Sequence, residues 1–395
     1  MPRFRQFLFW AHLATGLTCG TIIGLLCFTG TLLTYEKELT AYFERDARRV
    51  AMPATDTPRL PLDELQRRLR EAHPEANPNN IVVARDPQVA VAFVSGRTGN
   101  YYVNPHTGEV RRPASEQAAR FMQTMVTWHR YIGFSGEQSR PRGKLVTGIV
   151  NFAFAGLACT GLILWCPRSM SWRAFRPGIW FTQNATARAR DWNWHNAIGF
   201  WCAPVLIVLT LTALPISFRW GAELTYLLTG TPLPATGPQY YSTPPPAATV
   251  PTPPPEAKPV PRDLLLDAVR REVPAWQTVT FRYAHQPDPT KPQPVNFTVR
   301  ESDTLPRTAT ATLQFDPFTG TLLQRDGYND LSAARKLRVW TRFLHTGEAL
   351  GPWAQFLAGV ASLGGCFLVY TGFALSWRRF FRNQQSPTAT GAEPT

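Results

Sequence analysis

Four long segments without a charged side chain constrain this chain more than any other feature. They cover residues 7–35, 145–166, 196–218 and 354–377, and each is at least 22 residues long. With a rise of about 1.5 Å per residue, a helix of this length crosses the roughly 30 Å hydrocarbon core of a bilayer. Core helices of soluble proteins rarely contain so long an apolar run. The pattern therefore predicts an α-helical membrane protein with a four-helix transmembrane bundle.

Basic residues in the short flanking segments predict the orientation of this bundle. Arg3 and Arg5 precede the first span, five arginines lie in the connection 167–193, and Arg378 and Arg379 follow the last span. Because short cytoplasmic flanks carry an excess of Lys and Arg, both termini are expected in the cytoplasm and the two long connections outside. The net charge of +14 is then expected to reflect topology and the bilayer surface, with no nucleic-acid partner.

The two halves of the chain repeat one another, which predicts an internal two-fold duplication. In each half an amphipathic helical pattern, at 61–74 or 261–274, precedes strand-like runs, and the turns "NPHTGEV" and "DPFTGTL" correspond. Each long connection is therefore expected to form a small α+β domain. The expected boundaries are 1–36 for transmembrane helix 1, 37–143 for outer domain 1 with the approach to helix 2, 144–167 for helix 2, 168–193 for a cytoplasmic loop, 194–219 for helix 3, 220–261 for a Pro-rich tether, 262–350 for outer domain 2 with the approach to helix 4, 351–378 for helix 4 and 379–395 for a cytoplasmic tail.

Four of the seven histidines occur at matched places in the two halves. His12 and His195 lie near the cytoplasmic ends of spans one and three, whereas His129 and His345 precede spans two and four on the outer side. Ionisable residues at membrane depth are costly and usually functional. Four such histidines, recurring in this way, predict two pairs of imidazoles, one near each face of the membrane.

Two imidazoles that face each other across a helix bundle suit haem iron, which takes axial ligands from opposite faces. The i, i+4 spacing places Gly16 on the same helix face as His12, and Gly199 on the same face as His195, which leaves room for a flat macrocycle. Zinc is less apt because no Cys, Asp or Glu is placed to complete a tetrahedral set, and bare copper or non-haem iron would need further ligands. Without a C-x-x-C-H motif, the expectation is two non-covalent haem b groups, each with two histidines.

Arginines near the outer histidines are candidate partners for haem propionates. Arg130, Arg140 and Arg142 surround the approach to span two, and Arg342 precedes His345. Charge-assisted hydrogen bonds to carboxylates would suit the propionates. For each arginine, contact with anionic lipid headgroups remains an alternative.

Thr-Gly pairs recur in the spans, among them those at positions 29–30, 160–161 and 371–372. Small residues at transmembrane interfaces allow helix backbones to approach closely. The pairs are therefore predicted to support helix packing.

In this order, these features resemble the PepSY-associated transmembrane helix family. The resemblance rests on "FWAHLATGLTCGTIIGLLCFTGTLL", on the segments ending "NPHTGEV" and "DPFTGTL", and on spans that end at Arg, and it covers nearly the whole chain except tails and tether. Members include bacterial inner-membrane, iron-regulated proteins and ferrisiderophore reductases that look like dihaem cytochromes. The resemblance implies two PepSY-like periplasmic domains, haem ligation by the four histidines, and reduction of a periplasmic ferric siderophore.

The expected function is therefore a haem-dependent ferric-chelate reductase of the bacterial inner membrane that serves iron acquisition. No G-x-G-x-x-G follows a strand and no P-loop is present, so the electrons would come from an external donor, a quinol or a cytoplasmic reductase. Two alternatives remain open. The chain could be a non-redox membrane module whose PepSY domains bind a periplasmic protein or peptide, or a permease for a siderophore or haem.

Overall fold

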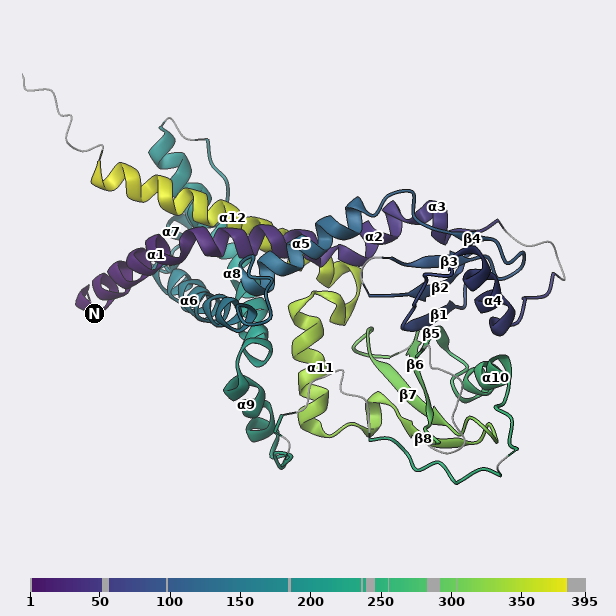
Figure 1. Ribbon diagram of the computed structural model, residues 1–395. Coiled ribbons are helices and arrows are strands. Elements are labelled where there is room, and N and C mark those ends of the chain that lie inside the picture. Colours follow the sequence, from purple (N-terminus) through teal and green to yellow (C-terminus); the bar gives the residue numbers. More distant parts are fainter. Residues whose placement is uncertain are drawn as a thin grey trace, which may run out of the picture. The chain divides into compact units, whose positions relative to one another are not determined.

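The structure is a computed structural model that divides into two compact units (Figure 1). It describes residues 2–51, 57–96, 99–183, 186–235, 237–238, 246–254, 256–282, 292–302 and 304–381. The helical unit comprises Met1–Thr34, Val126–Phe218 and Gln355–Thr395. The sheet unit comprises Tyr35–Met125 and Arg219–Ala354.

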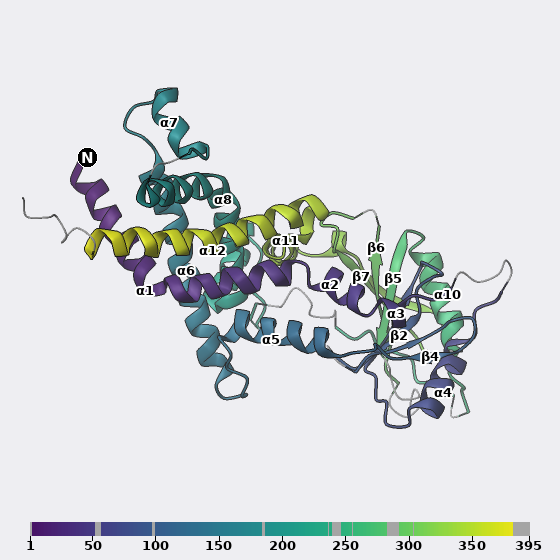
Figure 2. The same ribbon diagram turned by 90° about the horizontal axis from the view of Figure 1, so that it is seen from above.

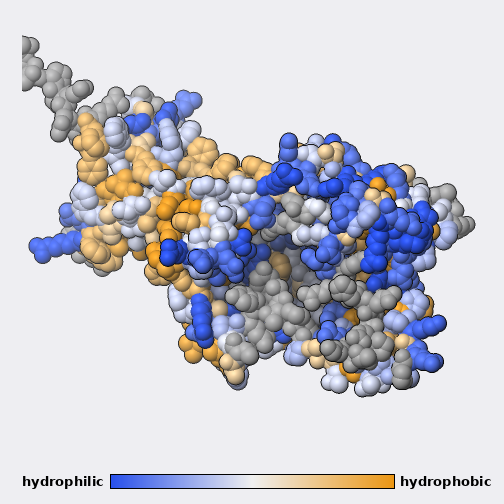
Figure 3. Space-filling view, in the orientation of Figure 1, coloured by the Kyte–Doolittle hydropathy of each residue, from blue (hydrophilic) through white to orange (hydrophobic). Residues whose placement is uncertain are grey.

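Four helices in the structure are long and apolar enough to cross a membrane, which confirms the four predicted spans. They are α1 (Pro2–Thr34), α6 (Arg140–Trp165), α8 (Ala187–Ser217) and α12 (Pro352–Phe380). Large apolar side chains such as Phe7 and Phe152 are exposed on them. Figure 3 shows hydrophobic residues gathered over this part of the surface. Such a surface is expected where lipid, rather than water, surrounds the helices.

The connection expected as a loop over 168–193 is largely helical. It contains α7 (Trp172–Ile179) and the first turns of α8, which begins at Ala187, well before the apolar run. Thr186 caps α8 by accepting a hydrogen bond from the Ala189 N–H at 3.2 Å. The sequence prediction followed apolar residues only, whereas a helix continues through polar turns when its end is capped.

Glycines and polar side chains determine how closely the long helices pack. A Cβ atom added to Gly20 of α1 would lie 2.9 Å from the Phe373 ring of α12, so these two helices approach where the side chain is missing. The Asn151 amide of α6 donates to the Thr210 carbonyl of α8 at 2.9 Å. Figures 1 and 2 show the four helices lying together.

The strands of both halves form one antiparallel sheet in the sheet unit, in the order β4-β3-β2-β1-β5-β6-β7-β8. The strands are β1 (Asn80–Ala84), β2 (Val91–Val94), β3 (Tyr101–Val103), β4 (Val110–Arg111), β5 (Trp276–Arg282), β6 (Val295–Glu301), β7 (Thr310–Phe315) and β8 (Leu322–Asp326). β1 and β5 pair from Asn80 opposite Arg282 to Ala84 opposite Thr278. The expected pair of separate domains is therefore a single sheet, because each half would otherwise expose the unpaired backbone of its first strand.

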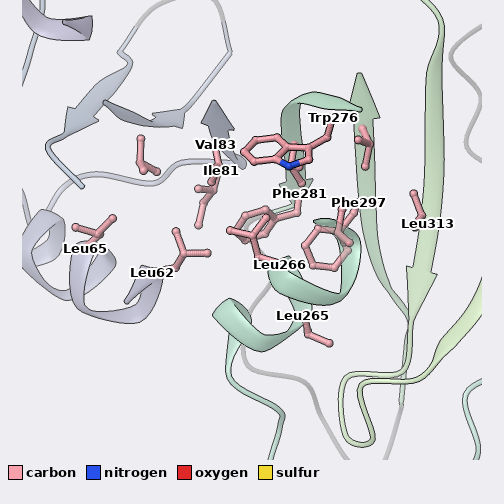
Figure 4. Packing of buried hydrophobic residues seen from close by; sticks show 14 of the residues in the cluster. Leu62, Leu65, Ile81, Val83, Leu265, Leu266, Trp276, Phe281, Phe297 and Leu313 are labelled. Atoms are coloured by element: carbon pink, nitrogen blue, oxygen red, sulfur yellow. The ribbon is translucent and has the colours of Figure 1, made fainter. Parts of the chain in front are cut away.

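Two helices pack against the sheet and contribute apolar side chains to the core of the sheet unit. α4 (Leu62–Ala72) and α10 (Arg262–Glu272) come from corresponding places in the two halves. Figure 4 shows their leucines packed toward the aromatic residues of β5 and β6. The two helices are also joined directly, since the Leu62 N–H donates to the Asp263 carboxylate at 2.9 Å.

The remaining helices connect these elements. They are α2 (Glu36–Phe43), α3 (Arg45–Arg48), α5 (Gln117–Tyr131), α9 (Arg219–Thr229) and α11 (Ala333–His345), with short 3-10 turns η1 (Tyr328–Asp330) and η2 (Glu348–Leu350).

The predicted Pro-rich tether, 220–261, differs from the expectation in two ways. Its first residues form α9, whose apolar face buries Tyr226. Further along, the buried Gln314 side chain of β7 accepts from the Ala248 N–H at 2.6 Å and donates to the Pro246 carbonyl at 2.9 Å. This part of the tether is therefore held against the sheet. Residues 236, 239–245 and 255 of the tether lie outside the described residues.

Candidate functional site

Three histidines of the helical unit are each held by a threonine from another helix. In every case the ring nitrogen is Nδ1 and the partner is the threonine hydroxyl Oγ1. Each threonine is followed by glycine, in the Thr-Gly pairs at positions 29–30, 160–161 and 371–372. The contacts, all with 2.9 Å between Nδ1 and Oγ1, are His12 with Thr160, His129 with Thr29, and His195 with Thr371.

The hydroxyl proton of each threonine is directed to its own helix. Thr160 donates to the Gly156 carbonyl at 2.7 Å, and Thr371 donates to the Phe367 carbonyl at 2.8 Å. Thr29 makes the equivalent bond, at 2.7 Å, to the carbonyl four residues earlier. A hydroxyl has a single proton, so its lone pair must accept the hydrogen bond from the imidazole. We therefore assign the ring proton to Nδ1 and the ring lone pair to Nε2.

The glycine after each threonine lies beside the histidine ring, although only Gly30 is close enough for an added Cβ atom to crowd it. A Cβ atom added at that glycine would face the Cε1 atom of the ring in all three places. The distances are 3.5 Å for Gly161 to His12, 3.3 Å for Gly30 to His129 and 3.7 Å for Gly372 to His195. The threonine contacts with the imidazoles were not predicted from the sequence, because these pairs were assigned to helix packing. Their recurrence at matched places in the spans was the available signal.

His12 and His195 line one cavity among the four long helices. Its volume is about 1160 Å³, which exceeds the roughly 300–1,000 Å³ of a typical small-molecule pocket. Gly16 and Gly199 also line this cavity. A Cβ atom at Gly16 would meet no atom within 4 Å, and one at Gly199 would meet only Leu368, at 3.7 Å. The space predicted beside these two glycines is present.

The walls of the cavity are apolar and aromatic, whereas four arginines contribute positive charge. The arginines are Arg5, Arg168, Arg188 and Arg379. Arg5 donates to the Cys166 carbonyl at 2.8 Å and also to the Leu164 carbonyl, at the end of α6. The Arg379 guanidinium lies 5.0 Å from the Phe9 ring centre. These four arginines differ from those predicted from the sequence, which are near the outer histidines.

The arginines predicted near the outer histidines have other neighbours than the cavity of His12 and His195. Arg130 and Arg140 lie over the Tyr131 ring, at 5.4 and 5.7 Å from its centre. Arg142 is exposed in the first turn of α6. Arg342 belongs to α11 of the sheet unit. None of these four is among the residues lining the cavity of His12 and His195.

The two outer histidines belong to different units. His129 is near the end of α5, in the part that belongs to the helical unit, and its ring lies on Thr29 of α1. His345 is the last residue of α11, in the sheet unit, where Ser332 caps the start of the helix. Within the residues that the structure describes, no group of three or more His, Cys, Asp or Glu could hold a bare metal ion.

A comparison with protein families identifies the chain over almost its whole length. The profile described as the PepSY-associated TM region matches residues 9–379, so it covers most of α1 and α12, all of α6 and α8, and the sheet unit. This result confirms the resemblance seen in the sequence. A comparison with curated proteins found no match. The chain is a membrane protein that belongs to the family of the PepSY-associated TM region.

Proposed function

We propose that this chain is a haem b protein of the bacterial inner membrane that carries electrons outward and reduces a periplasmic ferric siderophore. One observation carries the proposal. His12 of α1 and His195 of α8 line the same cavity, and each is hydrogen-bonded through Nδ1 to a threonine. Both rings therefore carry their lone pair on Nε2, the atom that an iron porphyrin would need.

The residues around the cavity fit this cofactor in four respects. Two neutral imidazoles come from different helices, and open space lies beside Gly16 and Gly199. The apolar walls suit the macrocycle, and arginines such as Arg168 and Arg188 suit carboxylate groups through charge-assisted hydrogen bonds. When bound, haem supplies one-electron chemistry that ordinary side chains do not offer.

Histidines at two depths support two haem sites. His12 and Thr29 are 17 residues apart on α1, which corresponds to about 25 Å along a helix. Because the His129 ring lies on Thr29, the helical unit carries imidazoles near both ends of α1. We assign His12 and His195 to the inner haem. On the basis of the sequence repeat, we assign His129 to the outer haem.

The substrate and the electron donor follow from the family resemblance and from the predicted orientation. A quinol or a cytoplasmic reductase would supply one electron for each Fe³⁺ that is reduced to Fe²⁺. The ferrous ion is softer than the ferric ion and is held less tightly by oxygen chelators, so reduction would release iron for uptake.

Counting haem in the purified full-length chain tests the proposal. A pyridine haemochrome assay is expected to give two haem b groups per polypeptide, with a Soret band that sharpens and shifts on reduction. Mixing the reduced protein with a ferric hydroxamate chelate should return the oxidised spectrum and produce ferrous iron. A colourless but folded preparation would instead favour the non-redox binding module. Uptake of the chelate into sealed vesicles without any reductant would favour the permease.

A further inference from the structure

We infer that the threonines of these Thr-Gly pairs position the haem ligands: each threonine orients the imidazole and sets its tautomer, and the ring lies beside the following glycine. Thr29, Thr160 and Thr371 are the positioning residues, and they act through His129, His12 and His195. This inference rests on the proposed function, because it concerns how the chain presents nitrogen atoms to haem.

Packing alone does not account for the pattern. A threonine in a transmembrane helix commonly bonds back to the carbonyl four residues earlier, and a glycine commonly allows close approach. Neither the threonine bond nor the close approach at glycine requires a histidine ring at the same place. Yet in all three pairs the same ring nitrogen meets the same hydroxyl at 2.9 Å, and the same ring carbon faces the following glycine.

The contacts also alternate between helices in a regular way. In the first half, His12 of α1 bonds to Thr160 of α6, while His129, which precedes α6, bonds to Thr29 of α1. In the second half, His195 of α8 bonds to a threonine of α12. Each hydroxyl is anchored to the backbone of a long helix, so its position is nearly as rigid as the helix itself.

The hydrogen bond has two consequences for a metal ligand. It keeps the proton on Nδ1, so the ring cannot turn an N–H toward the iron, and it increases the basicity of Nε2. Partners of this kind commonly change metal affinity by about 10- to 100-fold when they are removed. A more basic ligand favours the ferric form, so loss of the bond should move the reduction potential of that haem to a more positive value.

Thr160→Val in the full-length protein tests the inference, because valine keeps the shape of threonine and removes its hydroxyl. We expect about 10- to 100-fold faster or more complete loss of one haem to excess apomyoglobin. The electron paramagnetic resonance signal of that ferric haem should shift, and its potential should rise. Thr160→Ser, which retains a hydroxyl, should restore all three properties. Thr371→Val removes the hydroxyl that contacts His195, the other proposed ligand, and provides an independent second test on the same haem.

Thr18→Val is the matched control. Thr18 is an exposed threonine of α1 whose hydroxyl also bonds back to the helix, at 3.0 Å from the Ala14 carbonyl, and it does not line the cavity. This variant should leave both haems unchanged. If wild-type protein holds two haems while Thr160→Val and Thr371→Val keep its spectra, potentials and haem retention, the inference is wrong and the proposed function stands. If wild-type protein holds no haem, both fail.

Discussion

The Nδ1 atom of His195 in α8 lies 2.9 Å from the hydroxyl of Thr371 in α12, and Thr371 itself is fully buried. This bond joins two transmembrane helices whose contacting residues are 176 positions apart in the sequence. The same relationship links His12 to Thr160. Both histidines line one cavity, so the hydrogen bonds that join the helices also determine how the two rings enter that space.

Replacing either histidine of the cavity should remove one haem and leave the other. His12→Ala or His195→Ala takes away a proposed ligand of the inner haem, whereas the proposed outer haem depends on neither residue. Haem per polypeptide, measured as the pyridine haemochrome, should fall from two to one. His73→Ala, in the sheet unit, is the control and should keep two. Retention of both haems in His12→Ala and His195→Ala would contradict the pairing.

Filling the space beside Gly16 should exclude the inner haem. A Cβ atom at Gly16 meets nothing within 4 Å, so Gly16→Leu can be accommodated by the helix while its side chain enters the cavity. We expect one haem per polypeptide instead of two. Gly156→Leu serves as the control, since a Cβ atom there also meets nothing within 4 Å and Gly156 does not line the cavity. Equal haem content in the two variants would argue that Gly16 provides no clearance.

The ion pairs of Asp191 should contribute strongly to the stability of the helical unit. Asp191 of α8 has a side chain that is 1% exposed, and it pairs with Arg378 of α12 and, at 2.9 Å, with Arg190. Asp191→Asn leaves arginine charge without its buried partner, which typically costs about 3–5 kcal/mol. The variant should unfold at lower temperature, as followed by circular dichroism in detergent.

An exposed ion pair provides the comparison for Asp191. Glu223→Gln breaks the pair of Arg219 and Glu223, whose side chains are 77% and 37% exposed. Exposed pairs contribute about 0–1 kcal/mol, so this variant should melt close to wild-type protein. If the two variants lost the same stability, burial of Asp191 would not be the cause.

Glu64 of α4 should make the sheet unit sensitive to acid. Hydrogen bonds from Arg67 and Arg68 lower the pKa of this carboxyl to about 2. A depressed pKa means that the charged form is favoured in the folded state, so its stabilisation is present above the unfolded pKa of about 4.3. It is lost as the pH falls toward 2. Glu64→Gln should therefore be less stable than wild-type protein at pH 6, and the difference should disappear near pH 2.

Denaturant titrations followed by tryptophan fluorescence at several pH values would measure this effect. Glu71→Gln is the matched control, because Glu71 lies on the same helix and pairs with the same Arg67. A wild-type curve that runs parallel to that of Glu64→Gln over the whole acid range would show that the carboxyl does not act in this way.

Features that depend on neighbouring residues were predictable from the sequence. The four spans were found because a helix satisfies its own backbone hydrogen bonds in lipid, so apolar length alone identifies it. Strand-like runs were expected in each half, and one of them is β6, Val295–Glu301, since alternation of side chains is a local property. The N-cap at Thr186 was not recognised in the sequence. The predicted start of α8 therefore lies later than the observed start at Ala187.

The repeat in the sequence also indicated which histidines to compare, although it could not supply their partners. His12 and His195 were paired because they occupy equivalent positions, and the structure places both on one cavity. The Thr-Gly pairs were visible as a motif, but their contact with the histidines depends on which helices pack together and at what rotation. No spacing along the chain encodes those two quantities.

The amino-acid sequence by itself determined the elements of this protein: four membrane-spanning helices, two sets of strands and a repeated set of histidines. Only the tertiary structure decided that β1 and β5 join the two sets into one sheet, and that Thr160 and Thr371 hold His12 and His195. The physical reason is the separation along the sequence between the residues that interact. Secondary structure follows from hydrogen bonds and side-chain alternation within a few residues, whereas these contacts arise when distant segments bury their surfaces against each other.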